Sequence, residues 1–144
     1  MIDNPMKNEI ENEESPFKPE YLTYIDEYTG RGTLKIQVSV ADGSFPLKGA
    51  AVNVAKLLNG HRYLLYSDTT DLSGIVNELV LPALPREDSL KPETANGGAE
   101  YLVSIFHPSF KDIIDCPVTV YDKVETIFPA SPEPLNAETE AENG

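Results

Sequence analysis

The sequence has no tryptophan and a single cysteine, Cys116, among its 144 residues. One cysteine excludes a disulfide within the chain, so an apolar core has to hold the fold together. We interpret Cys116 as a small buried apolar side chain, because no neighbour in the sequence supplies the base that a nucleophilic thiolate needs.

Long apolar runs are also missing. No stretch approaches the roughly 20 residues that a membrane-spanning helix requires. The first residues, MIDNPMKNEIENEE, lack the apolar segment of a secretory signal peptide. The sequence therefore predicts neither a membrane span nor a signal peptide.

Basic residues are scarce: 11 lysines and arginines stand against 24 acids, giving a formal net charge of −13. The acids are concentrated at the ends, because residues 1–29 carry a net charge of −6 and residues 131–144 one of −4. Both segments are poor in apolar side chains, so we expect a mostly flexible acidic lead-in (1–29) and a disordered acidic tail (131–144) around one folded domain, residues 30–130. This charge excludes nucleic acid as a partner, since phosphates are bound by Lys and Arg.

Short apolar runs recur between turn residues throughout the central part of the chain. Leu34, Ile36 and Val38, for example, alternate with polar side chains, which is the pattern of a half-buried strand. The same pattern predicts seven strands, at residues 33–40, 50–58, 61–67, 75–81, 99–106, 111–120 and 124–128. Pro117 indicates an edge strand or a bulge. Seven short strands separated by turns predict an all-β, Greek-key β-sandwich with antiparallel or mixed sheets.

We assign six residues between these strands as structural turn residues: Asn59, Gly60, Asp68, Asp71, Gly74 and Pro108. Asn59-Gly60 favours a type I′ hairpin, because both residues tolerate a positive φ. The carboxylates of Asp68 and Asp71 can accept nearby backbone N–H groups, and Gly74 can adopt a left-handed conformation.

Two segments lack a strand pattern. Residues 82–98 contain three prolines and two glycines and form a long irregular loop, a kind of loop that is usually functional or mobile. In residues 19–30 the aromatic side chains of Tyr21, Tyr24 and Tyr28 are spaced as on one face of a helix, but an extended segment lying against the sandwich is equally compatible. We favour the extended segment.

The central part of the chain resembles transthyretin-like (prealbumin-like) and carboxypeptidase-regulatory-like domains. These share a P-(x)-x-G-A-x-V segment, then a T-D-x-x-G turn, then a tyrosine-containing strand that ends in P-G-(Y/F). The matching residues here are Pro46, Gly49, Ala50, Val52, Thr70, Asp71, Gly74, Tyr101, Val103, Pro108 and Phe110, with Ser109 in place of the usual glycine. The resemblance covers residues 30–130 and implies a transthyretin-like fold, but these architectural residues imply no activity.

The chain is also similar to the sandwich region of clostridial spore cortex-lytic proteins at residues 28–30, at Gly32, and at residues 34–38 and 70–74. This narrower resemblance implies an association with a spore or cell-wall system. If the chain is complete, it is then expected to be cytoplasmic or spore-associated.

No catalytic or metal-binding arrangement follows from the sequence. We interpret His61 and His107 as exposed turn residues rather than bases, and two histidines without matching carboxylates predict no zinc site. The Tyr-Arg-Gly-Ser ending of transthyretin-like hydroxyisourate hydrolases is missing. Lys35 lies on the polar face of its strand, which excludes an isopeptide crosslink, and residues 68–74 lack the ligand array of a calcium loop. We therefore predict no catalytic residue, no cofactor, no metal site and a protein that is not an enzyme.

The predicted function is a structural or protein-interaction module. We expect a protein partner, either a second copy or another chain, at unpaired sheet edges or at the 82–98 loop. Tyrosines suit interfaces, although strand-face packing explains them equally well; the candidates are Tyr63, Tyr66, Tyr101 and Tyr121. The alternative is a carbohydrate- or peptidoglycan-binding module, which the absence of tryptophan disfavours.

Overall fold

The computed structural model describes residues 13–14, 18–85 and 98–135 of the chain. Its elements are β1 (Glu13–Glu14), α2 (Pro19–Glu27), β2 (Gly30–Val40), β3 (Phe45–Pro46), β4 (Ala51–Leu58), β5 (His61–Thr69), β6 (Ile75–Ala83), β7 (Ala99–Phe106), β8 (Ile113–Val120) and β9 (Glu125–Ala130). All seven predicted strands are present, with ends that differ by at most a few residues. The two additional strands, β1 and β3, are too short to produce a recognisable period in the sequence.

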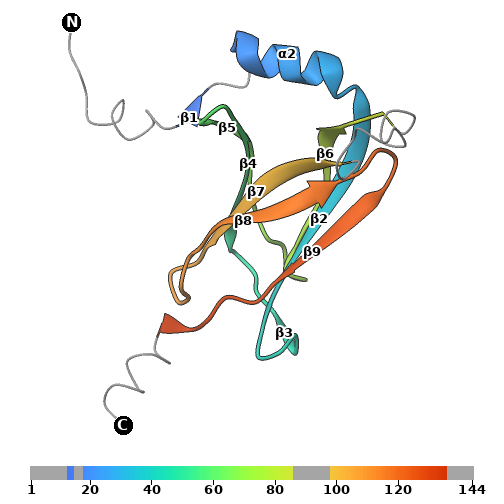
Figure 1. Ribbon diagram of the computed structural model, residues 1–144. Helices are drawn as coiled ribbons and strands as arrows, with labels where there is room; N and C mark the ends of the chain where they lie inside the picture. The colour runs from blue at the N-terminus through green and yellow to red at the C-terminus, as the bar shows by residue number, and fades with distance from the viewer. Residues whose placement is uncertain (1–12, 15–17, 86–97, 136–144) are drawn as a thin grey trace, which may run out of the picture.

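The strands form two sheets that pack against each other (Figure 1). One sheet has the order β1-β5-β4-β7-β8, and in the other β2 pairs with β3, β6 and β9. The β1–β5 and β2–β9 pairs are parallel, and the other pairs are antiparallel. The predicted all-β sandwich with mixed sheets is therefore confirmed.

The core lies between the facing sheets and follows the alternation seen in β2. Leu34, Ile36 and Val38 are each at most 1% exposed, while the intervening side chains point away from the core. Val54 of β4 and Val103 of β7, which are register partners, meet them from the opposite sheet. The buried apolar side chains at every second position of β2 thus fix its register in the sheet, because a slip by one residue would turn all of them toward water.

Two of the predicted turns have the geometry that their chemistry favours, whereas Asp68, which was assigned to a turn, lies in β5, where its carboxylate accepts the N–H of Thr69 at 2.8 Å. Asn59 and Gly60 have φ values of 52° and 84°, as the type I′ hairpin between β4 and β5 requires. The Asp71 carboxylate accepts the backbone N–H groups of Ser73 and Ile75 at 2.8 and 2.9 Å, and Gly74 has a φ of 74°. The turn before β6 is therefore closed by one side chain and one left-handed glycine.

Residues 19–27 are helical, so the predicted extended lead-in is wrong. Pro19 stands in the first turn of α2, where proline is well tolerated because that N–H has no partner within the helix. Tyr21 and Tyr24 are buried and form a second, smaller apolar cluster with Tyr63 of β5. Their ring centroids lie 5.6 Å (Tyr21–Tyr24) and 5.7 Å (Tyr21–Tyr63) apart. The helix covers one end of the sandwich (Figure 1), and this tertiary contact decides its conformation.

Two further predictions need correction or lie outside the described residues. Cys116 is partly exposed rather than buried, because β8 is an edge strand, as Pro117 indicated. The first residues of the predicted 82–98 loop, as far as Ala83, belong to β6. Residues 86–97, together with 1–12, 15–17 and 136–144, lie outside the described part of the chain, and so do most of the predicted loop and acidic termini.

Candidate functional site

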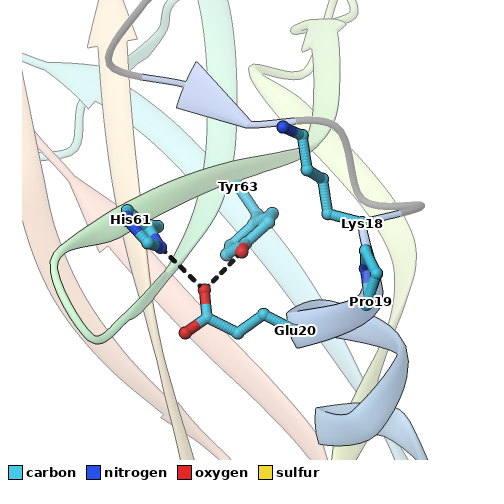
Figure 2. Close-up of a pocket in the computed structure, with 5 residues that line it drawn as sticks. All are labelled: Lys18, Pro19, Glu20, His61 and Tyr63. Atoms are coloured by element: carbon cyan, nitrogen blue, oxygen red, sulfur yellow. Dashed lines mark hydrogen bonds and ion pairs between the residues drawn. The ribbon is translucent and has the colours of Figure 1, made fainter.

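A pocket of about 380 Å³ opens where the start of α2 meets the start of β5. Its lining residues are Lys18, Pro19, Glu20, His61 and Tyr63. Figure 2 shows the Glu20 side chain reaching from the helix toward His61 and Tyr63 on the strand. The pocket therefore combines a helix end and a hairpin that are about 40 residues apart in the sequence.

The Glu20 carboxylate accepts three hydrogen bonds. Tyr63 donates its hydroxyl to Oε1, His61 Nδ1 lies 2.9 Å from the same oxygen, and the Asn59 amide donates to Oε2 at 2.7 Å. These bonds, with that from Tyr63 as the largest cause, lower the pKa of Glu20 from 4.5 to about 2. An ionised Glu20 thus fastens α2 to the β4–β5 hairpin, because each donor stabilises the charged form.

The Glu20–His61 pair orients an imidazole at the rim of the pocket. A carboxylate that binds Nδ1 fixes the ring, so a ligand would meet the Nε2 edge of His61, whose side chain is 58% exposed. The described residues contain no group of three potential metal ligands. His61 is exposed, as predicted from the sequence. The sequence did not identify Glu20 as its partner, because no local spacing links residues so far apart.

A set of satisfied polar groups lies behind the pocket, beneath α2. The Tyr24 and Tyr101 hydroxyl oxygens are 3.0 Å apart, and Tyr101 donates to the carbonyl of Pro82. Lys56 Nζ lies 4.9 and 5.2 Å from the centroids of these two rings and donates to the carbonyl of Glu100 at 2.8 Å. Burial lowers the pKa of Lys56 and raises those of both tyrosines. Each group has a partner, so this set stabilises the packing of α2.

Two of the tyrosines considered as interface contacts are core residues. Tyr63 and Tyr101 are 1% and 0% exposed, so neither ring can touch a partner. Tyr66 is partly buried and donates its hydroxyl to the carbonyl of Val80 at 2.7 Å. Tyr121 is exposed, in the turn between β8 and β9. Packing therefore explains most of these side chains.

The three hydrogen bonds of the Glu20 carboxylate to Asn59, His61 and Tyr63, which we call the Glu20 clamp, predict that the fold loses stability in acid. The pKa of Glu20 is lower in the folded chain, about 2, than its ordinary value of 4.5, so the ionised form stabilises the fold above that value. This contribution is lost as the pH falls from about 4.5 toward 2. We expect Glu20→Gln to be less stable than the wild type near neutral pH, and the difference to shrink across this window. Urea unfolding at a series of pH values measures it.

Glu27→Gln is the matched control, because it removes one exposed acid from the same helix without touching the clamp. A difference between wild type and Glu20→Gln that stays constant from neutral pH to pH 2 would contradict the assignment of the carboxylate.

The outer face of the sheet β5-β4-β7-β8 is a second candidate surface, which we define by Leu57, Arg62, Ser104, Ile114 and Asp115. Arg62 of β5 donates to the carboxylate of Asp115 on β8 at 2.7 Å, so the ion pair crosses the two strands between them. Asp115 also receives support from Ser104 of β7, whose hydroxyl accepts its N–H at 2.9 Å. Leu57, the register partner of Arg62, and Ile114, which stands with Asp115 opposite Ser104 at the shift in register, are 51% and 59% exposed. No helix of the described residues covers this face.

The sheet edges are less suited to accepting a partner strand than the sequence suggested. β8 contains Pro117 and a shift in register beside Asp115, whose φ is 51°. β9 contains Pro129, and β6 bends at Glu78, whose φ is 57°. The start of β5 is paired with β1. Prolines and bulges interrupt the row of backbone groups that strand addition requires, so side chains on the outer face are the better contact surface.

No family model and no curated protein matches this sequence. Solved structures with a similar fold include 3-chlorocatechol 1,2-dioxygenase from Rhodococcus opacus 1CP, with 9% identity and a TM-score of 0.50 over 74% of this chain and 61% of that one. 5-Hydroxyisourate hydrolase from Klebsiella pneumoniae has 14% identity and a TM-score of 0.43, covering 70% of this chain and 90% of the hydrolase. Transthyretin from Sparus aurata has 12% identity and a TM-score of 0.40, covering 68% and 89%. This chain thus spans less than two thirds of the dioxygenase.

Transthyretin is thus among the structures with a similar fold. The prediction that the chain is not an enzyme needs correction. The dioxygenase with a similar fold is an enzyme, so this architecture gives no ground for excluding catalysis. The described part of the chain contains no helix long and apolar enough to cross a membrane.

Proposed function

We propose that the chain is a structural, protein-interaction module that binds its partner through the outer face of β5-β4-β7-β8. The observation that carries the proposal is the exposure of two apolar side chains next to the residues of the Arg62–Asp115 ion pair: Leu57 is the register partner of Arg62, and Ile114 precedes Asp115. Apolar side chains around an oriented charge pair provide both buried area and directional contacts, which is how protein interfaces achieve specificity.

Photo-crosslinking tests this surface. A benzoylphenylalanine at position 57 or 114 is expected to crosslink one and the same protein in the cells that make the chain. The matched controls are positions 80 and 127, on the outer face of the other sheet, where Val80 and Ile127 are 46% and 50% exposed. Crosslinks from 57 and 114 should be lost on adding an excess of unlabelled chain. Equal crosslinking from all four positions, or none from 57 and 114, would refute the proposal.

The resemblance of residues 28–30, Gly32, residues 34–38 and residues 70–74 to spore cortex-lytic sandwiches supports a finer proposal, an association with a spore or cell-wall system. Immunolabelling of the chain in sporulating and vegetative cells tests it. Labelling at the spore surface or envelope is expected, and a signal that is uniform through both cell types would overturn this assignment.

The carbohydrate-binding alternative has no comparable support. Among the described residues, the exposed aromatic side chains are Phe45, at 63%, and Tyr121, at 39%. Phe45 pairs with Val40 at one end of β2, whereas Tyr121 lies beside Gly32 near the other end. They therefore form no shared platform on which a sugar ring could stack.

A further inference from the structure

We infer that the outer face of β5-β4-β7-β8 binds a second copy of this chain, about a two-fold axis that lies in the plane of the face between Arg62 and Asp115. The inference rests on the proposed function, since it names the partner of the same surface. It follows from the distribution of charge and apolar side chains across this face.

A two-fold interface has to be self-complementary, because the same patch serves both copies. The outer face meets this condition. Its β4–β5 side carries Leu57 and the cation of Arg62, and its β8 side carries Ile114 and the anion of Asp115. A rotation that exchanges the two sides places Arg62 against the partner's Asp115, and Leu57 against the partner's Ile114. Opposite charges and apolar side chains then meet twice.

The ion pair can be shared across this axis without being broken. A guanidinium has five N–H donors and a carboxylate has acceptor sites on both oxygens, so each can serve two partners. The buried hydroxyl of Ser104, a residue that is 2% exposed, accepts the backbone N–H of Asp115. The Arg62 side chain is only 19% exposed. Both charged groups are therefore already oriented, which reduces the entropy lost on association.

The acidity of the whole chain does not prevent this contact. Of the net charge of −13, residues 1–29 contribute −6 and residues 131–144 contribute −4, so the domain that carries the outer face is close to balanced. The edges of the sheets, interrupted by Pro117, Pro129 and the bends at Glu78 and Asp115, favour pairing through the face rather than continuous strand addition.

A charge exchange tests the two-fold contact. Arg62→Asp leaves two carboxylates at these positions, and Asp115→Arg leaves two guanidinium groups, so each variant alone places like charges against each other across the axis. We expect sedimentation velocity to show a concentration-dependent dimer for the wild type and an association constant lower by at least about tenfold for each variant. An equimolar mixture of the two variants should regain a 1:1 dimer, because opposite charges then meet between the copies. Circular dichroism of each variant verifies the fold.

Two apolar variants separate this contact from general charge attraction. Leu57→Asp, on the outer face, should abolish the dimer, whereas Ile127→Asp, at a similarly exposed position of the other sheet, should leave it unchanged. A wild type that stays monomeric at all concentrations, or a mixture that fails to associate, overturns the inference. If crosslinks from positions 57 and 114 then capture a protein other than this chain, only the identity of the partner as a second copy is refuted, and the proposed interaction surface stands. If they capture nothing, the proposed function fails as well.

Discussion

Replacing Tyr101 by alanine is expected to lower the free energy of unfolding by about 3–5 kcal/mol. The side chain is fully buried in the main core, and its hydroxyl joins Tyr24 of α2 to the carbonyl of Pro82 in β6. Truncation leaves a cavity, removes one of the rings beneath the Lys56 ammonium and deprives two polar groups of a partner. Urea or thermal unfolding, followed by circular dichroism, measures the loss.

Tyr101→Phe separates the two contributions. It keeps the ring and removes only the hydroxyl, so we expect a loss of about 1–3 kcal/mol from the partners left unsatisfied. Should the phenylalanine and alanine variants lose equal stability, the ring would contribute nothing, and the assignment of Tyr101 to the core would be incorrect.

Gly74→Ala is the second change with a large expected effect, a loss of about 2–5 kcal/mol, which combines left-handed strain with overpacking. Gly74 has a φ of 74°, and a Cβ atom built there lies 2.3 Å from the carbonyl oxygen of Val38. That contact is with the backbone of β2, which is itself held by a hydrogen bond from the Val38 N–H to the Gly74 carbonyl at 2.7 Å. Neither chain segment can move away without breaking the pairing, and equilibrium unfolding measures the loss.

Gly60→Ala is the matched control. Gly60 has a φ of 84°, but a Cβ atom at this position would meet no heavy atom within 4 Å outside Gly60 and its two chain neighbours. Only the strain remains, so a loss of about 1–2 kcal/mol is expected. Equal losses for the two variants would show that the close approach of Gly74 to β2 is relieved without cost.

Features with a local cause were predictable from the sequence. The alternation of Leu34, Ile36 and Val38 indicated β2, and Asn59-Gly60 indicated the hairpin, since both depend on neighbours in the chain. Pro117 correctly indicated an edge strand, because its missing N–H is tolerated there. At each of these positions the neighbouring residues in the sequence determine the local structure, so contacts with distant residues are not needed to predict it.

Features with a distant cause were not predictable. The spacing of Tyr21 and Tyr24 allowed a helix, but the choice depends on Tyr63, which packs against both from another element. Glu20 and His61 likewise meet only because α2 docks on the hairpin, so neither identified the pocket on its own. Cys116 is an apolar residue type by composition, but its place on an edge strand leaves it partly exposed.

The parallel pairing of β2 with β9 has a consequence for how the chain acquires its fold. It joins Thr33 to Glu125 and Val38 to Ala130, so one side of β2, the first strand of the core, is completed by β9, the last strand among the described residues. Contacts between such distant segments require closure of a long loop, and sandwiches dominated by them fold in milliseconds to seconds rather than microseconds. During synthesis, β2 therefore leaves the ribosome long before its final neighbour exists, and the sandwich closes only after nearly the whole domain has been made.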